Sequence, residues 1–386
     1  MIEIDKQHLR NTIANYRNFI DTCSFENDFK LTANSEISPY ALCFAIFSYH
    51  LIGDHGYILK NKNVWVEKII TNLDDFKNQQ QDLINSKPYL QLLTFSLSAL
   101  KILDSLDHPC IESHVILILN YDINDLLNRA GVKKGTPSSG NMAMFWAILL
   151  IHVNKFLNIS VEKDLDSWIT FHLDSMNDYG FWGEAKNMNY LMFQNGYHQY
   201  EILDYLKVEG EFWDVAATNI NSLKDSESRF APYPGGGGCY DYDALYFLTS
   251  DYIDPEFEET IIKLFYSVTS SQNIDGGFCE SQYVRPRTIK NFRRALNHIF
   301  SRPSGNRIEA IKKFISLQRP RHNKIHTHWT TYSREWSESD LWDSWFRVLL
   351  LARIDVYKNH ENFQNWGFIN YPGIGYHHLF NKEKNI

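Results

Sequence analysis

The sequence predicts an all-α protein built as an α/α toroid, a double-walled barrel of about six to seven helix pairs. Three observations lead to this prediction. Apolar residues recur at helical spacing along most of the chain, strand-like alternation is scarce, and short segments repeat about every 47 residues. A period of this size is too long for one helix and fits two helices with their connecting loop.

The repeated segments each begin with serine and close an apolar helical run. They cover 175–177, 222–224, 270–272 and 316–318. Three of them lead towards turns rich in glycine or aromatic residues, which we align with one another at 178–183, 233–238 and 275–278. The repeat therefore predicts that the least ordinary residues of the chain lie on loops at one end of the helix pairs.

Local signals support the individual helices. Ser38 followed by Pro39 is a good helix start, because serine caps the free N–H groups and proline suits the first helical position. Residues 142–157 are apolar nearly all round, which suits the inner wall of a closed double layer better than an open solenoid. The other predicted helices cover roughly 3–22, 63–80, 88–105, 110–129, 161–176, 194–207, 211–223, 241–250, 255–271, 287–301, 305–318 and 338–355. No long linker interrupts them, so we expect a single domain over 1–386, with the clearest repeats in 170–355.

Composition limits the function classes. Apolar residues at 44% and charged residues at 22% are ordinary for a globular soluble protein. The five cysteines form no C-x-x-C pair, so no disulfide framework or zinc ribbon is expected. The first residues lack the basic and apolar regions of a signal peptide, and no apolar run is long enough for an integral membrane segment. We therefore expect a cytoplasmic protein.

The net charge of -8, without a dense basic cluster, argues against nucleic acid as a partner. One local basic group, at 285, 287, 290, 293 and 294, is interpreted as a solvated helix face. The alternative is that it holds an anionic group such as a diphosphate or a carboxylate. Aromatic residues make up 15% of the chain, which is compatible with a core packed with aromatic side chains or with a cavity lined by them.

The glycine run 235–238 precedes the strongest candidate for chemistry. Glycines allow left-handed backbone angles and close approach to another group. Asp241 and Asp243 follow in the first turns of a helix, where one carboxylate is explained by the helix dipole. Two carboxylates beside Tyr240 exceed that need. In an aromatic cavity, burial and the neighbouring charge raise the pKa of one of them and give a general acid, for which we choose Asp243.

A second candidate lies on the helix after 195. His198 and Glu201 are three residues apart and share a face, with Tyr197 beside them. The plain alternative is a core histidine satisfied by a local carboxylate. Asn195 is explained equally well as the N-cap of this helix. Asparagine, histidine and tyrosine at the mouth of a toroid are also the proton-abstracting residues of toroidal polysaccharide lyases, an analogy at the level of fold. Trp182, on a repeated turn, is expected to contact substrate.

Segment 326–345 is dense in polar and aromatic residues. It is expected to close the cavity and to contact substrate through Trp329, Asp340 and Trp342, although a surface loop with incidental aromatics is the alternative. His326-Thr327-His328 lacks a third ligand at a suitable spacing, so no metal is expected, and no cofactor motif is present. We expect Trp182, His198, Asp241, Asp243 and Asp340 to converge on one mouth of the barrel.

Two motifs carry a family resemblance over roughly half of the chain. Gln272-Asn273-Ile274-Asp275-Gly276-Gly277-Phe278 resembles the Q-x3-G-x-W repeat of the terpenoid cyclase and protein prenyltransferase toroids, with Phe in place of Trp. Residues 235–244 resemble the glycine-rich approach to the D-x-D-D motif of class II cyclases, but Ala244 stands where the last carboxylate is expected. Cys239-Tyr240-Asp241 reverses the Asp-x-Cys order of the prenyltransferase zinc site, so that site is not transferred.

The resemblance implies a lyase or isomerase in which Asp243 protonates an isoprenoid alkene or epoxide. Asp241 then tunes the acid, and aromatic faces stabilise cations. Two alternatives stay open. One is a carbohydrate-active toroid, lyase or hydrolase, that uses His198 and a tyrosine on a glycan. The other is a toroid that binds a partner or a glycan without catalysis.

Overall fold

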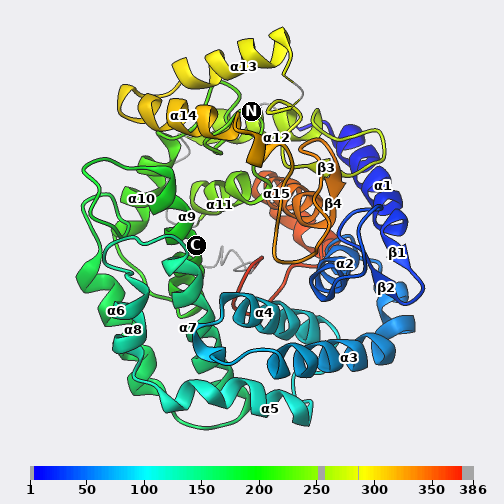
Figure 1. Cartoon of the computed structure of the whole chain (residues 1–386), viewed down its shortest axis with the longest axis vertical. Helices are drawn as coiled ribbons and strands as arrows, with labels where there is room; N and C mark the ends of the chain where they lie inside the picture. Colours follow the sequence, from blue (N-terminus) through cyan, green and yellow to red (C-terminus); the bar gives the residue numbers. More distant parts are fainter. Residues whose placement is uncertain (1–3, 251–256, 286, 376–386) are drawn as a thin grey trace. The chain divides into compact units, whose positions relative to one another are not determined.

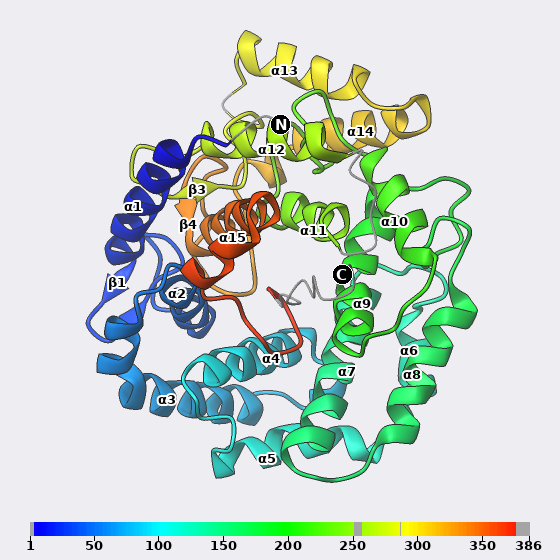
Figure 2. The same ribbon diagram turned by 180° about the vertical axis from the view of Figure 1, so that it is seen from behind.

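The computed structural model describes residues 4–250, 257–285 and 287–375 (Figures 1 and 2). Within these residues the chain forms fifteen α-helices, a few 3-10 turns and four strands of two residues each. The prediction of an all-α fold is therefore confirmed. None of the described helices combines the length and the apolar character needed to cross a membrane.

The chain packs as two compact units. The first takes the described residues of Met1–Asp54 and Ala216–Gly367, and the second takes those of His55–Val215 and Phe368–Leu379. Helix α10 (Phe212–Asn221) runs across the boundary in the sequence. Each unit is described by itself below, and a single domain over 1–386 stays a prediction.

The first unit is built around α15 (Leu341–Lys358), which packs against α11 (Gly238–Leu248) and α2 (Pro39–Leu51). Two antiparallel strand pairs complete it, one of which places Phe278 opposite Asp340. Its other elements are α1 (Lys6–Thr22), β1 (Ser24–Phe25), β2 (Asp28–Phe29), α12 (Glu258–Thr269), β3 (Phe278–Cys279), α13 (Ile289–Phe300), α14 (Ser304–Leu317), β4 (Ser339–Asp340) and 3-10 turns at Pro320–His322 and His360–Asn365.

The second unit is centred on α7 (Ser139–Phe156), which packs most extensively against α9 (Tyr190–Tyr205). The two helices approach closely at Gly140, where a Cβ atom would lie 2.0 Å from the backbone oxygen of Asn195. The unit also contains α3 (His55–Asn78), α4 (Lys87–Ile102), α5 (Pro109–Val115), α6 (Ile123–Ala130), α8 (Glu162–Ser175) and 3-10 turns at Leu83–Asn85 and Ile116–Asn120.

Helices that are apolar all round lie inside the units. Residues 143–153 of α7 and 40–49 of α2 are all buried. This burial is what the sequence predicted for the helix at 142–157, since a helix without a polar face needs neighbours on every side. These helices supply the inner layer of each unit, and the more amphipathic helices such as α3 and α13 keep one face in water.

One predicted helix is wrong as a continuous element. Residues 110–129 break into α5, a 3-10 turn and α6. The break occurs because the Asp122 side chain accepts the backbone N–H of Asp125 at 3.0 Å and so caps a new helix. Helix α9 begins at Tyr190, earlier than predicted, which places Asn195 inside the helix and not at its N-cap.

The repeat appears in the structure as one recurring turn. The backbone N–H of Asn177 donates to the oxygen of Phe181 at 2.7 Å, that of Asp225 to Arg229 at 2.9 Å, and that of Asn273 to Gly277 at 2.9 Å. The three turns are spaced at intervals of 48 residues and follow α8, α10 and α12. The sequence analysis placed the second turn of the repeat at 233–238. The structure places the equivalent turn at Asp225, and the glycines of 235–238 instead lead into α11.

Candidate active site in the first unit

The glycine run brings the start of α11 against α15. Gly235 and Gly237 have positive φ angles of +61° and +74°, which favour glycine. A Cβ atom at Gly238 would lie 2.7 Å from Oδ1 of Asp343, and the Gly238 N–H donates to that oxygen at 3.2 Å. The left-handed angles and the close approach predicted for these glycines are confirmed, and they join the acidic ends of two buried helices.

Asp241 is held between two arginines. Its Oδ2 lies 2.7 Å from Nη1 of Arg229 and also pairs with Nη1 of Arg347, while its Oδ1 accepts the backbone N–H of Phe230 at 2.9 Å. Asp241 and both guanidinium groups are fully buried. A buried carboxylate with this many donors is fixed in position.

Asp243 lies in a different environment on the same helix. It is 1% exposed, and among the described residues its Oδ1 has no hydrogen-bond partner. Burial, together with the negative charge of Asp241, raises the pKa of Asp243 well above its ordinary value, and a hydrogen bond with Cys239 opposes the shift. These are the two causes that the sequence predicted. Asp243 is thus a buried carboxylic acid whose protonated form is favoured by its surroundings.

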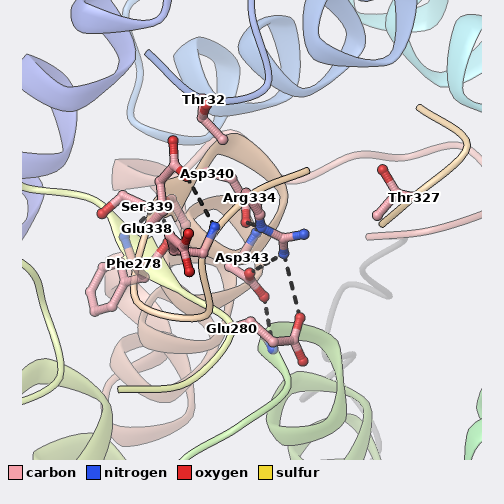
Figure 3. A network of polar contacts seen from close by, with 12 residues as sticks. Thr32, Phe278, Glu280, Thr327, Arg334, Glu338, Ser339, Asp340 and Asp343 are labelled. Atoms are coloured by element: carbon pink, nitrogen blue, oxygen red, sulfur yellow. Dashed lines mark hydrogen bonds and ion pairs between the residues drawn. The ribbon is translucent and has the colours of Figure 1, made fainter. Parts of the chain in front are cut away.

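A second cluster forms around Arg334 (Figure 3). Its guanidinium group lies 2.6 Å from Oδ2 of Asp340, 2.7 Å from Oδ2 of Asp343 and 3.5 Å from Oε2 of Glu280. Asp340 also caps α15, because its Oδ1 accepts the N–H of Asp343 at 2.8 Å. The pairing of β3 with β4 brings Glu280 to this cluster.

Glu280 is the most accessible carboxyl group of the cluster. Its side chain is 16% exposed, whereas those of Asp340 and Asp343 are at 0%. Burial and the charge of Asp343 raise its pKa, and the Tyr233 hydroxyl donates a hydrogen bond to it. Glu280 is a second carboxyl group whose protonated form is favoured.

Aromatic rings cover one side of α15. Trp329 and Trp342 are half-buried and lie 4.6 Å apart, centroid to centroid. Trp342 also contacts Phe346 at 4.5 Å and Phe44 at 5.2 Å. Ser38 donates to the backbone oxygen of Trp329 at 2.6 Å and fixes its loop. These side chains form an aromatic wall on the helix that carries Asp343.

The remaining predicted residues lie in the second unit. His198 is 3.8 Å from Oε2 of Glu201, and the Tyr197 hydroxyl donates to Oε1 of Glu201 at 2.5 Å. Burial and the nearby Lys87 charge lower the pKa of His198 to about 3, so its imidazole is neutral. Trp182 is 1% exposed and donates its indole N–H to His172 at 2.9 Å, which makes it a packing residue of this unit.

The structure thus groups Asp241, Asp243 and Tyr240 on α11, and Asp340 joins them through the start of α15. His198 and Trp182 belong to the other unit, and the convergence of all five residues on one mouth stays a prediction, as does every substrate contact. The residues that the sequence did not single out are Arg229, Glu280, Arg334, Asp343 and Arg347. Glu280 follows the QW-like turn directly, which is the one local signal that pointed to it.

The structure also tests the other motifs of the sequence. Gln272 of the QW-like motif donates to the backbone oxygens of Thr12 and Gly276, both at 2.8 Å, so it joins α1 to its own turn. Within the described part of the chain, no group of three or more His, Cys, Asp or Glu side chains is arranged to hold a metal ion.

Comparison with known proteins identifies the fold. No family model and no curated protein matches the sequence. Among solved structures, the chain is similar to the apo form of type II terpene cyclase MstE from Scytonema, at 10% identity and a TM-score of 0.53, over 92% of this chain and 99% of that chain. A variant of MstE with its substrate geranylgeranyl dihydroxybenzoate gives 10% identity and 0.51 over 91% and 97%. A glycosidase variant gives 10% identity and 0.50 over 92% and 100%.

These likenesses establish the fold class. The chain has the α/α toroid fold of the terpenoid cyclases, as the sequence predicted. The same fold serves a glycosidase, so fold by itself does not select the chemistry. The side chains of the two carboxyl clusters carry the functional argument.

Proposed function

We propose that this protein is a toroidal isoprenoid cyclase in which Asp243 is the general acid. The observation that carries the proposal is the contrast between two carboxyl groups on one helix. Asp241 is neutralised by two arginines, whereas Asp243 is buried beside it with a raised pKa. Environments that separate two carboxyl groups in this way assign the acid and its partner.

The reaction is an isomerisation. Asp243 gives its proton to one carbon of an alkene, or to an epoxide oxygen, and a carbocation forms. The next alkene of the chain attacks the cation and closes a ring with a new carbon–carbon bond. Loss of a proton from a neighbouring carbon ends the sequence, so substrate and product have the same formula. Arg229 and Arg347 hold Asp241, the partner of the acid, in position.

The half-buried faces of Trp329 and Trp342 support the same chemistry, because aromatic faces attract cations. The likeness in fold to MstE suggests a substrate class. MstE binds a geranylgeranyl chain attached to a dihydroxybenzoate. We therefore propose a linear polyprenyl compound for this protein, with or without an aromatic head group.

Solvent deuterium tests the proposal directly. Purified protein is incubated with geranylgeranyl dihydroxybenzoate, geranylgeraniol and a terminal epoxide of each, in H₂O and in D₂O, and the products are analysed by mass spectrometry. An alkene cyclised by an acid gives a product isomeric with the substrate in H₂O and carrying a single carbon-bound deuterium in D₂O. Asp243→Asn is the control for background cyclisation. Failure to convert any of these compounds, or conversion of an alkene without carbon-bound deuterium, contradicts the proposal. An epoxide opened by the acid carries its deuterium on the new hydroxyl group, where it exchanges, so the epoxides are assessed by product formation alone.

Glu280 supports a second candidate function. It is a partly accessible carboxyl group with a raised pKa, which is the property of the acid in glycoside hydrolysis. The expected result for a glycosidase is sugar release that Glu280→Gln abolishes and Asp243→Asn preserves. His198 is a poorer choice, since its pKa of about 3 makes it a weak base and Tyr197 donates to Glu201 instead. Neither reaction is expected of a non-catalytic binding protein.

A further inference from the structure

The hairpin formed by α13 and α14 has an unusual surface. Both views show the two helices side by side at the outer edge of the first unit, and the Phe292 and Phe314 rings lie 6.4 Å apart (Figures 1 and 2). Helix α13 buries only Ala295, His298 and Ile299. The opposite side of the hairpin is therefore exposed to solvent.

Those residues form two apolar stripes. On α13 the stripe consists of residues spaced three or four apart, which are highly exposed: Ile289 at 76%, Phe292 at 54%, Leu296 at 36% and Phe300 at 63%. On α14 it consists of Ile308 at 62%, Ile311 at 40% and Ile315 at 57%. Single exposed apolar residues are common, but contiguous stripes on adjacent helices mark an interaction surface.

Basic residues accompany the stripes. Between 285 and 324 the sequence has twelve Lys and Arg residues and one acidic residue, Glu309, whereas the whole chain has 38 basic and 46 acidic residues. Arg287, Lys290, Arg293 and Lys312 are exposed. Arg293 is the next residue after Phe292 on α13, and Lys312 is the next residue after Ile311 on α14. Consecutive residues of a helix are rotated by about 100°, so each cation lies beside an apolar stripe and not within it. The sequence interpretation of a solvated basic face therefore omitted its apolar half.

A hollow of about 490 Å³ lies at the base of the hairpin and is lined by Tyr283, Phe292, Phe314 and Arg287 among others. Three arginines of the sequence cluster are used locally. Arg285 donates to Gln318 and Leu317, Arg287 donates to the backbone oxygen of Gln318, and Arg294 stacks over Tyr283 at 3.8 Å. Of the exposed cations, Lys290, Arg293 and Lys312 are distinct from these arginines, whereas Arg287 also ties the segment before α13 to the end of α14.

We propose that the α13–α14 hairpin docks on an anionic lipid membrane surface. Apolar stripes bordered by Lys and Arg are the pattern of helices that lie in the interface, with the rings among acyl chains and the cations at the headgroups. A nucleic acid has no use for exposed phenylalanines and isoleucines. In a symmetric dimer the hairpin would face the same hairpin of a second copy, and the cations of the two copies would repel one another. This inference is independent of the reaction proposed above.

Vesicle co-sedimentation tests the docking. The full chain is mixed with phosphatidylcholine vesicles with and without phosphatidylserine, at low and high salt. Binding is expected on the anionic vesicles, and it should weaken as salt rises. The apolar variant replaces four stripe residues and carries Phe292→Gln, Phe300→Gln, Ile308→Gln and Ile315→Gln. We expect this variant to bind at least about 100-fold more weakly, because each buried side chain contributes about tenfold or more.

The charge variant carries Arg287→Gln, Lys290→Gln, Arg293→Gln and Lys312→Gln. We expect it to lose about fivefold per cation at low salt and little at high salt. A matched control on the second unit carries Leu59→Gln, Lys60→Gln, Lys101→Gln and Lys163→Gln, which are exposed positions, and it should bind like the unaltered protein. Circular dichroism should be the same for all, since none of the side chains is buried.

Several results would overturn the docking proposal. These are no binding to anionic vesicles, equal loss in the control variant, or binding that the hairpin variants leave unchanged. A dimer in sedimentation velocity that the apolar variant dissociates, without vesicle binding, would assign the hairpin to a second copy of the chain. Binding to RNA that depends on the cations alone would assign it to a nucleic acid.

Discussion

Replacing Asp243 by asparagine should change activity and stability in opposite directions. Asparagine has nearly the same shape and is neutral, like the protonated form of Asp243 that burial favours. The fold should therefore be retained. Asparagine has no acidic proton to give to a substrate, so the proposed chemistry should fail. A change that removes function while keeping or increasing stability identifies a residue held for its chemistry.

The size of the stability change follows from the raised pKa. Unfolding exposes Asp243, whose pKa returns to about 3.9, and the carboxyl group then releases the proton that it holds when folded. The free energy of unfolding consequently decreases as pH rises from about 4 towards the pKa of the folded state, by about 1.4 kcal/mol per pH unit. Asp243→Asn removes this dependence. The position of Oδ1 has no hydrogen-bond partner among the described residues, so an amide group there leaves a buried polar atom unsatisfied, which costs about 1–3 kcal/mol.

Near pH 4 the variant should thus be no more stable than the original protein. As pH rises, the free energy of unfolding of the variant should increase steadily relative to that of the original protein. Urea denaturation at pH 4, 5, 6 and 7 measures the difference in free energy of unfolding. Turnover should fall by about 10²–10⁴-fold, the usual loss when a general acid is removed. Product formation is measured with the substrates named above.

Asp125→Asn is the matched control, because Asp125 is an exposed acidic residue in the first turn of α6. It should cost about 0.3–1 kcal/mol through the helix dipole and leave activity intact. If Asp243 were only such a residue, its variant would behave in the same way. Full turnover in Asp243→Asn, or a stability difference that does not vary with pH, refutes the reasoning.

Three further predictions concern the packing of the two units. Asp241→Asn should destabilise the fold by about 3–5 kcal/mol, since it leaves two buried guanidinium groups without their carboxylate. A loss below about 1 kcal/mol in urea denaturation would contradict this. Because the expected loss is large, this variant is unsuitable as a mild control for activity. Gly238→Ala should lower the free energy of unfolding by about 1–3 kcal/mol, because its Cβ atom would lie 2.7 Å from Oδ1 of Asp343. An unchanged melting temperature would contradict this and would show that α11 and α15 can move apart at little cost. His172 and His198 are buried and neutral with pKa values lowered to about 3. The contribution of each to stability should therefore decrease as pH falls from 6.5 towards 3, by about 1.4 kcal/mol per pH unit and in the direction opposite to that of Asp243. His172→Asn should remove one of the two contributions, and an unaltered slope of the free energy of unfolding against pH would refute this.

Helices were predictable because their signals are local. The start at Pro39, the buried run at 142–157 and the recurrent serine-led segments each depend on residues within one or two turns of each other. The same is true of Asp241 and Asp243, which a glycine run marks in the sequence. The alignment of the second turn was wrong because its glycines are more conspicuous than Asp225, whose side chain forms the turn by accepting the N–H of Arg229 at 2.9 Å.

The partners of these acids were not predictable, because they come from distant parts of the chain. Arg347 lies 106 residues from Asp241, and Glu280 lies 54 residues from Arg334. Arginine and glutamate are expected at the surface unless a partner is known. Only the packing of α11 against α15 and the pairing of β3 with β4 bring these charges together. The sequence pattern predicts the position of the proposed acid, whereas the fold supplies the environment that raises its pKa.

The charges of the first unit give this environment a physical reason. The two clusters contain five carboxyl groups, at 241, 243, 280, 340 and 343, and three guanidinium groups, at 229, 334 and 347. Ionisation of all five would leave two uncompensated negative charges in a buried region, which is costly. Asp243, Glu280 and Asp340 all have raised pKa values, with burial as the first cause, so this region favours holding protons over full ionisation. The shortage of arginines therefore favours a protonated carboxyl group of the kind that the proposed reaction needs, and each raised pKa lowers stability as pH rises above the ordinary pKa of a carboxyl group.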